Sequence, residues 1–407
     1  MSLIPRCLAV LVAGWFLSLA FLGSPASAGP SGPPIKVGGT LALTGPLGST
    51  SIVHKIAAEI FIEQLNRKDG LLGRPVEYIL LDDQSKPDLT RSLYERLITV
   101  DKVDLIMGAH ATQANLSAMG VAQRYGKLFL ASTMIIDPRR PSYEMYFPTQ
   151  AMGPEPYRTM PEAVLDALAS TGRPPKTIAV LASKFPSTHF ITLGAKEVMK
   201  KRGLDIVLDL EYEFGNRDFG AIAARVKEAN PDFLWVGSIG TDGVMIAEAL
   251  KKLDYAPKGQ LTLYPAPAPM TASPDTKYAF AMSVFEEHPP FTDSPVVAEF
   301  VKIYHERAAK AGLSYTQVDH QAALGYAIWE ILVAAVSATK SLDDKVLAQW
   351  LKNNTVNTII GKQRFGCINN STCDDLFKVK QVQGGRWVTV WPKEWAMPGA
   401  KLIYPAP

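Results

Sequence analysis

From residue 35 onward, short apolar runs alternate with longer segments whose apolar positions recur every three or four residues. The short runs have the length and residue types of strands, and the longer segments have the period of amphipathic helices. Up to residue 131, the pattern predicts strands at 35–41, 76–81, 104–108 and 128–131 and helices at 54–67, 89–100 and 115–125. Because strands and helices alternate regularly, we expect a doubly wound α/β lobe with parallel strands.

A second series of the same kind follows the break Gly153-Pro154-Glu155-Pro156. It predicts helices at 158–169, 191–202, 219–228 and 243–253, and strands at 177–181, 205–210, 233–236 and 260–263. A second open α/β lobe of similar plan is therefore expected. The remainder predicts helices at 296–311, 320–339 and 345–353, followed by short strands at 377–382 and 387–390.

The last third of the chain has too few strands for a third domain, so we expect it to cross back and complete both lobes. The predicted division is lobe I from 35–152 and about 286–360, lobe II from 153–285 and about 361–392, and a C-terminal tail at 393–407. Several crossing strands form a hinge between the lobes, with a cleft beside it. Ligands of open α/β sheets bind outside the carboxyl ends of the strands, so the loops there are the expected site.

The first residues have the pattern of a secretory signal peptide. Arg6 precedes an apolar run at 8–22, and Ala26 and Ala28 form an Ala-x-Ala cleavage site. A membrane anchor is the alternative, but the helix-breaking residues after the apolar run favour cleavage. We therefore expect residues 1–28 to be removed and the mature protein to be periplasmic.

Cys367 and Cys373 enclose a short polar stretch that can turn and bring the two sulfurs together in an oxidising compartment. We expect a disulfide, with two free thiols as the alternative. Two thiolates without a neighbouring histidine do not indicate a zinc site. The chain has 42 basic and 39 acidic side chains, and they are scattered rather than grouped. This balance does not indicate nucleic acid or an anionic membrane surface as a partner.

Catalytic signatures are scarce along the sequence. It contains no His-Glu-x-x-His zinc motif, no phosphate-binding loop ending in Gly-Lys-Ser/Thr and no Gly-x-Ser-x-Gly nucleophile elbow. His305 and Glu306 lack the second histidine of the zinc motif, and the glycines at 38–48 have the wrong spacing for a dinucleotide loop. We therefore expect a binding protein that is not an enzyme and needs no metal or cofactor.

The predicted strand ends carry hydroxyl, small and aromatic side chains instead. They are Thr50, His110, Ala111, Thr112, Ser132 and Thr133 in the first lobe, and Phe185, Ser187, Ile239 and Tyr264 in the second. Hydroxyls and backbone N–H groups at a helix N-terminus can hold a carboxylate, and the apolar groups suit the body of a small organic ligand. The alternatives are that Thr112 and Ser132 only cap helices and that Phe185 and Tyr264 are core residues.

The order of these loops resembles the type I periplasmic substrate-binding proteins of branched-chain and hydrophobic amino acid ABC importers, the leucine-isoleucine-valine-binding family. The markers are Ile35-Lys36-Val37-Gly38, Leu43-Thr44-Gly45-Pro46, Gly70-Leu71-Leu72-Gly73-Arg74-Pro75, Leu81-Asp82-Asp83-Gln84, Asp104-Leu105-Ile106-Met107-Gly108 and Gly385-Arg386-Trp387. The resemblance covers nearly the whole mature chain. It implies a binding protein, expected to be a monomer, that passes a solute to membrane permease subunits. It also places Thr112 where that family's hydroxyl and backbone N–H hold the ligand carboxylate.

The sequence departs from that family at several site positions. Thr50, Ser187 and Ile239 stand where members often carry an aromatic side chain. Amino-acid-binding members also present an acidic residue to the ligand ammonium, whereas the matching loop here reads Tyr264-Pro265-Ala266-Pro267. An ammonium buried without a counter-charge is costly, unless Asp242 reaches it.

We therefore expect capture of a small carboxylate with an apolar or aromatic body by closure of the cleft. A hydrophobic amino acid or a small amide is the alternative ligand. A ligand-sensing receptor subunit, or an enzyme on this fold, is the alternative class.

Overall fold

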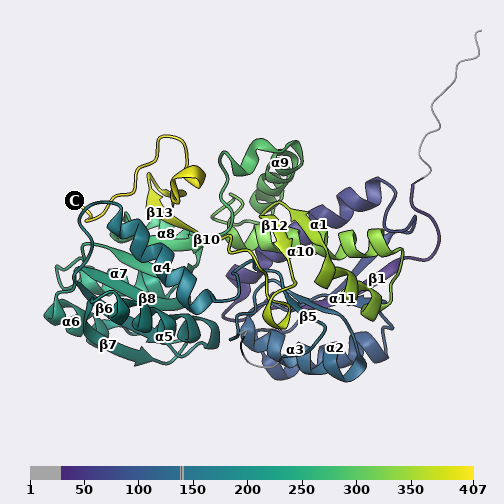
Figure 1. Cartoon of the computed structure of the whole chain (residues 1–407), viewed down its shortest axis with the longest axis horizontal. Coiled ribbons are helices and arrows are strands. Elements are labelled where there is room, and N and C mark those ends of the chain that lie inside the picture. Colours follow the sequence, from purple (N-terminus) through teal and green to yellow (C-terminus); the bar gives the residue numbers. More distant parts are fainter. Residues whose placement is uncertain (1–28, 138, 140–141) are drawn as a thin grey trace, which may run out of the picture.

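The computed structural model describes residues 29–137, 139 and 142–407 of the chain. Two lobes lie side by side; purple, blue and light green elements form one, and teal and yellow elements form the other (Figure 1). We call the lobe with the described N-terminus lobe I and its neighbour lobe II. The expected signal peptide, residues 1–28, lies outside the described residues.

Lobe I starts with a parallel sheet. Its first elements are β1 (Ile35–Leu41), α1 (Gly48–Arg67), β2 (Val76–Asp82), α2 (Pro87–Thr99), β3 (Leu105–Ile106), α3 (Thr112–Tyr125), β4 (Phe129–Ala131) and β5 (Tyr146–Pro148). Strand β1 lies between β2 and β3, and β4 pairs in parallel with β5. A hydrogen bond of 2.8 Å from Gly108 N to Leu130 O places the end of β4 beside the end of β3. The loops that follow these strands therefore lie at one edge of the lobe.

Lobe II is built on a seven-stranded sheet in the order β14-β13-β10-β9-β8-β6-β7. Its elements are α4 (Pro156–Ala169), β6 (Thr177–Ser183), α5 (Pro186–Lys201), β7 (Asp205–Tyr212), α6 (Gly220–Ala229), β8 (Phe233–Gly240), α7 (Asp242–Lys251), β9 (Gln260–Pro265), α8 (Pro267–Ala272), β10 (Phe280–Ser283), β13 (Lys378–Gln383) and β14 (Arg386–Trp391). Strands β6 to β10 run parallel, and β13 and β14 extend the sheet in antiparallel pairing.

Different helices cover the two faces of the lobe II sheet, because successive side chains of a strand point to opposite faces. Val180 and Trp235 share a core cluster with residues of α4 and α5. Leu181 and Val236, each the next residue along its strand, belong to a second cluster with residues of α6 and α7. Strands buried on both faces are continuously apolar, which is why the sequence pattern identified them. The expected doubly wound α/β architecture is confirmed.

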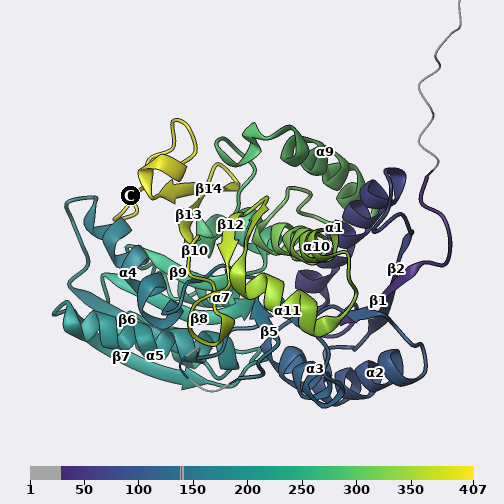
Figure 2. The ribbon, with the colours of Figure 1, turned by 45° about the vertical axis from the view of Figure 1, so that its right-hand side comes forward.

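The chain crosses between the lobes three times. The crossings run from β5 to α4, from β10 to α9 (Pro295–Lys310), and from β12 (Gly361–Arg364) to β13. Met152 in the first crossing forms an isolated bridge with Asp375 in the third. Leu376 N also donates to Ala151 O at 2.9 Å. These crossings form the multi-strand hinge expected from the sequence, and β12 lies where the lobes meet in both views (Figures 1 and 2).

Cys367 and Cys373 form the expected disulfide in the third crossing. The loop that it closes is fastened to lobe I, because Asn370 Nδ2 donates to the carbonyl oxygens of Glu144 at 2.8 Å and Tyr146 at 3.0 Å. The disulfide therefore stabilises a segment that leads directly into the hinge.

Lobe I is completed by α9, α10 (His320–Thr339), α11 (Asp344–Asn353) and the hairpin of β11 (Thr355–Thr358) and β12. By length and composition α10 could cross a membrane, but 67% of its most apolar stretch is buried inside the structure. It packs against α1 and is a core helix of lobe I. The sequence analysis expected a buried helix here.

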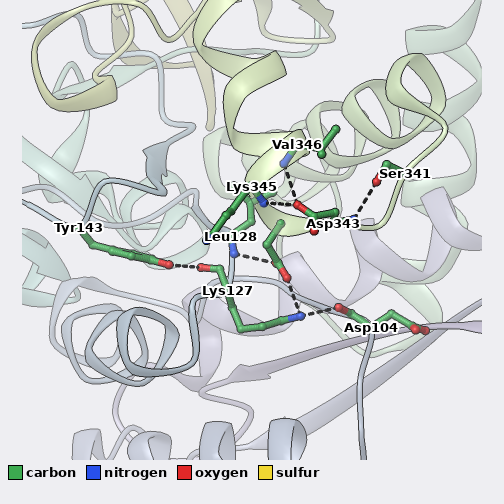
Figure 3. Close-up of polar contacts among 9 residues, drawn as sticks. Asp104, Lys127, Leu128, Tyr143, Ser341, Asp343, Lys345 and Val346 are labelled. Carbon is green, nitrogen blue, oxygen red and sulfur yellow. Dashed lines mark hydrogen bonds and ion pairs between the residues drawn. The ribbon is translucent and has the colours of Figure 1, made fainter.

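Polar contacts hold α11 against the first part of lobe I (Figure 3). The ammonium of Lys127 lies 2.8 Å from Asp344 Oδ2, and Leu128 N donates to Asp344 Oδ1 at 2.8 Å. Lys127 Nζ also donates to Asp104 O at 2.6 Å. The neighbouring Asp343 caps α11 by accepting from two backbone N–H groups of its first turn. This segment, late in the sequence, is therefore fixed to the edge of the sheet formed early in the sequence.

Three helices begin at least three residues earlier than the sequence pattern predicts. Helices α1, α3 and α5 start at Gly48, Thr112 and Pro186 instead of at residues 54, 115 and 191. Their first turns carry small or polar residues, so the apolar period becomes visible only in the second turn. As a result, Thr50, Thr112 and Ser187 lie in first helical turns rather than in loops. The pattern also missed β5, β10, β11 and β12, which are too short to show a period.

Candidate ligand-binding site

The expected ligand-binding residues lie along the sheet edges where the two lobes meet. Helix α3 of lobe I contacts α5 of lobe II, and both helices begin at these edges. All ten candidates except Thr133 are buried, with at most 7% exposed. Ala111 of lobe I and Phe185, Ile239 and Tyr264 of lobe II belong to one continuous apolar cluster. The structure therefore brings residues from both lobes into one enclosed region.

The loop between β3 and α3 is held in an unusual backbone conformation. Ala111, the N-cap residue of α3, has φ of 70° and ψ of 155°. Such a conformation costs about 1–3 kcal/mol for a non-glycine residue and is found preferentially at functional sites. Ala111 N donates to Thr133 Oγ1 at 2.8 Å, and Asn115 Nδ2 donates to the carbonyl oxygens of Ala109 and Ala111 at 2.8 and 3.0 Å. These hydrogen bonds hold the strained residue in place.

The N-terminus of α3 can accept a negatively charged group. No side chain caps it. Thr112 Oγ1 accepts a hydrogen bond from Ile135 N at 3.2 Å, so the hydroxyl proton of Thr112 is still available to donate. The first backbone N–H groups of an α-helix have no intrahelical acceptor, and the helix dipole favours an anion there. Thr112 and the first turn of α3 can therefore hold a carboxylate together.

The other candidate hydroxyls have different roles. Thr133 Oγ1 accepts from Ala111 and also donates to Ala109 O at 3.3 Å, so it supports the loop. Thr50 donates to Leu47 O at 3.0 Å within the first turn of α1. Ser132 and Ser187 are buried, and among the described residues their hydroxyls are not recruited into side-chain hydrogen bonds.

The candidates in lobe II are of two kinds: one packs in the core of the lobe, and the others lie at the ends of strands. Phe185 is 1% exposed and its ring lies 4.8 Å from that of Phe214, so it packs as a core residue of lobe II. Ile239 and Tyr264 stand opposite each other at the carboxyl ends of β8 and β9. The Tyr264 ring stacks on His320 of α10, with 5.8 Å between ring centroids. Tyr264 therefore connects lobe II to a helix of lobe I.

Two further histidines lie beside the predicted site residues, and sequence reasoning missed both. His54 of α1 lies 5.2 Å from His110, measured between ring centroids, and its Nε2 is 2.9 Å from Gln321 Oε1. Burial lowers the pKa of His54 to about 4, although its hydrogen bond with Gln321 acts in the opposite direction. Burial, and then the neighbouring His54, hold the pKa of His110 well below its usual value. Both rings are therefore neutral near pH 7.

His320, the second of these histidines, links the hinge to Tyr264. Its Nδ1 accepts a hydrogen bond from Val284 N at 3.2 Å, so its neutral ring carries the proton on Nε2. Gln150 Nε2 lies 3.4 Å from this Nε2. Burial, and then Lys380 and His54, lower the pKa of His320 well below its usual value. Two crossing segments thus converge on this ring.

Two acidic side chains bear on whether an ammonium group can bind. Asp242 Oδ2 accepts a hydrogen bond from Tyr212 Oη at 2.9 Å, and burial raises the Asp242 pKa to about 6. Asp375 of the third crossing is exposed as a residue, although partial desolvation of its carboxyl raises its pKa, and its Oδ1 accepts from Phe377 N at 2.9 Å. After burial, the charge of Asp375 is the next cause of the raised pKa of Tyr264. Asp375 therefore acts on the Tyr264 ring, whereas Asp242 is engaged by Tyr212.

The missed residues, His54, Asn115, His320 and Asp375, gave only a weak signal in the sequence. His54 and His320 are single polar residues in largely apolar helical segments. Such residues are more often satisfied core groups than ligand contacts, and only the packing of α1 against α10 brings these two towards the loop of α3. Asp375 lies in an irregular segment with no period to interpret.

The sequence model of the periplasmic binding protein family matches residues 34–386, and the chain belongs to this family. It is therefore a solute-binding protein of ABC transporters and not an enzyme, and its family acts outside the cytoplasm. Leu/Ile/Val-binding protein homolog 7 of Brucella abortus (strain 2308) is 24% identical over 413 residues, which cover 95% of this chain and 98% of the relative.

Solved structures show the same fold at low sequence identity. A leucine-binding protein from Thermotoga maritima has a TM-score of 0.74 and 19% identity, with 87% of this chain and 97% of that chain covered. A solute-binding protein of an ABC transporter from R. palustris, in complex with benzoate, has a TM-score of 0.72 and 18% identity, with 88% and 95% covered. The expected type I periplasmic binding protein fold is confirmed.

Proposed function

We propose that this protein captures a small carboxylate with an apolar or aromatic body and delivers it to the permease subunits of an ABC importer. The observation that carries the proposal is the buried, uncapped N-terminus of α3. There the hydroxyl proton of Thr112 and the first N–H groups of the helix are available to an acceptor. A carboxylate is the small organic group that best matches such a set of donors.

The opposite side of the site favours an apolar ligand body. Tyr264, Pro265 and Ala266 follow one another where β9 ends, and none of them carries a charge. Ile239 stands beside Tyr264. Asp242 already accepts a hydrogen bond from Tyr212, so it would stabilise an ammonium group less than a carboxylate without a partner would. An α-amino group would therefore lose its hydration here without full compensation.

The relatives are consistent with either ligand class. The R. palustris neighbour has benzoate bound, whereas the Thermotoga maritima neighbour is named for leucine. A hydrophobic amino acid is the second candidate, and the observation in its favour is Asp375, an exposed carboxylate of the third crossing whose charge contributes to the raised pKa of Tyr264. In that case Asp375 would supply the counter-charge that the loop after β9 lacks.

Calorimetric titration of the mature protein separates the two ligand classes. We expect benzoate or phenylpyruvate to bind more than tenfold tighter than phenylalanine and leucine, a difference of about 1.4 kcal/mol. Tighter binding of either amino acid would refute the proposal. The variant Asp375→Asn sharpens the test: it should leave a carboxylate ligand largely unaffected, whereas an amino acid held by Asp375 would lose most of its affinity.

We further propose that residues 1–28 direct export and are removed near Ala28, in agreement with the extracytoplasmic location of the family. N-terminal sequencing of the protein recovered from the periplasm should begin near Gly29. A protein that retains its first residues in the membrane would indicate an anchor instead.

A further inference from the structure

The two histidines beside α3 differ in how their ring nitrogens are used. His54 Nε2 is paired with Gln321 Oε1 at 2.9 Å. His110 is 1% exposed, and its Nδ1 has no hydrogen-bond partner among the described residues. A buried polar atom without a partner is rare and calls for an explanation, such as an absent ligand. His110 is also only two residues before Thr112, in the loop that leads into α3.

A carboxylate enclosed at the N-terminus of α3 needs a positive charge nearby, because an uncompensated buried charge is strongly unfavourable. Among the described residues, three cations of neighbouring elements are already engaged. Lys184 pairs with Glu213 at 2.5 Å, and Lys380 pairs with Glu286 at 2.7 Å. Arg139 pairs with Asp137 and lies over the Tyr157 ring. An imidazole that gains a proton is therefore the simplest source of the missing charge.

The surroundings of His110 allow this change on ligand binding. The titratable side chain that most directly affects His110 is His54, which is neutral near pH 7. Next to these rings, on α10 and β2, are His320 and Tyr78; burial depresses the pKa of His320 and raises the pKa of Tyr78. Among the described residues, burial and His54 are the causes that act on the pKa of His110, and neither favours its charged form. A ligand carboxylate within about 4–6 Å would favour the charged ring and raise the pKa of His110.

A small cavity lies beside His54 and the residues that precede His110. It has a volume of about 20 Å³ and is lined by His54, Tyr78, Ser132 and the backbone at Gly108 and Ala109, among others. This is enough room for one water molecule and too little for a ligand body.

We propose that His110 supplies the counter-charge for the ligand: on capture of a carboxylate it takes up one proton from solvent and pairs with the carboxylate as an imidazolium. This inference rests on the proposed function and names the chemistry of that site. The ligand stays a carboxylate throughout, and the proton enters on His110, while His54 remains neutral. Recognition is then selective for anions, because a neutral or cationic ligand would not stabilise the charged ring.

Calorimetric titration of benzoate or phenylpyruvate tests this directly. Near pH 7, the enthalpies measured in phosphate and in Tris should differ by the number of protons taken up multiplied by the difference between the ionisation enthalpies of the two buffers. We expect that number of protons to be close to one. Affinity should rise by up to about tenfold for each pH unit of decrease between pH 8 and 5.5, since one proton binds with the ligand. Binding of either probe with no proton uptake would overturn the inference and leave the proposed function standing.

Matched variants assign the proton to one residue. His110→Gln cannot be protonated, so it should remove both the proton uptake and the pH dependence, with an affinity that approaches the wild-type value near pH 8. His54→Gln and the surface variant His305→Gln should retain the uptake. Uptake that persists in His110→Gln would overturn the assignment. Should His110→Gln not fold, the wild-type comparison in two buffers still decides whether a proton is taken up. Failure of both probes to bind, with leucine bound instead, would refute the proposed function and this inference together.

Discussion

The hydroxyl of Thr133 accepts a hydrogen bond of 2.8 Å from the backbone N–H of Ala111, the residue with a left-handed φ at the N-cap of α3. Two strand-end loops of lobe I are thereby joined at the point where a carboxylate is proposed to bind. The donors of the first turn of α3 are held in place before any ligand arrives. Preorganised donors cost less to align on binding, which increases affinity.

Replacing Thr133 by Val should therefore destabilise the loop although the side chain keeps its shape. The Ala111 N–H would lose its acceptor in a buried position, which costs about 1–3 kcal/mol. We expect a lower Tm and weaker binding of benzoate by calorimetry. Thr133→Ser keeps the hydroxyl and should restore both properties. A Thr133→Val protein with unchanged stability and affinity would show that this hydrogen bond does not support the loop.

Thr112 is predicted to contact the ligand directly. Thr112→Ala removes the hydroxyl proton available to a carboxylate and should weaken binding by about 1–3 kcal/mol, the usual range for a hydrogen bond to a charged group. Thr339→Ala is the matched control, because the Thr339 hydroxyl donates only to Ala335 O within α10. If the Thr112→Ala protein and the control bind with equal affinity, then the Thr112 hydroxyl only accepts the hydrogen bond from Ile135 N and does not contact the ligand.

Asp242 should make stability depend on pH. Burial raises its pKa to about 6 in the folded protein, from 3.8 as its ordinary value. The folded state therefore favours the protonated carboxyl, and stability falls as pH rises from about 4 to 6. Asp242→Asn keeps an acceptor for Tyr212 and removes this loss, so it should stabilise the protein by about 3 kcal/mol at pH 8.

The same Asp242→Asn variant should gain little at pH 4, where the wild-type carboxyl is protonated in the folded state. Thermal unfolding of both proteins at the two pH values is the measurement. An equal gain at both pH values would mean that the stabilisation does not come from the charge.

The disulfide should stabilise the third crossing. Cys367 and Cys373 close a short loop that Asn370 fastens to lobe I. In the chain-entropy picture, opening a loop of this size costs about 2 kcal/mol. The double variant Cys367→Ser with Cys373→Ser should have a correspondingly lower Tm, and thiol labelling of the denatured, unreduced wild-type protein should find no free thiol at either position. Two labelled thiols would contradict the pairing.

The α/β class and most elements could be predicted because they depend on local pattern. The strands of lobe II are buried on both faces, so β6 and β8 are continuously apolar and stand out between amphipathic helices. The helix α10 was predicted at its observed bounds, since almost its entire length is apolar. Strand β10 was missed because its pairing with β13, about a hundred residues later, stabilises it. The hairpin of β11 and β12 was missed because its strands of four residues are too short to show a period.

The sequence by itself determined the strand-end loops and their residue types, because a parallel sheet places the ends of its strands at one edge. It could not determine which side chains have a free donor. Thr112 and Thr133 look alike in the sequence, yet one keeps its hydroxyl proton available and the other supports the loop backbone. His54 and His320 lie near the site only because α1 packs against α10. Asp375 lies there only because the third crossing between the lobes pairs with the first. Hydrogen bonds and burial depend on contacts between residues far apart in the chain, so the tertiary structure alone decided these roles.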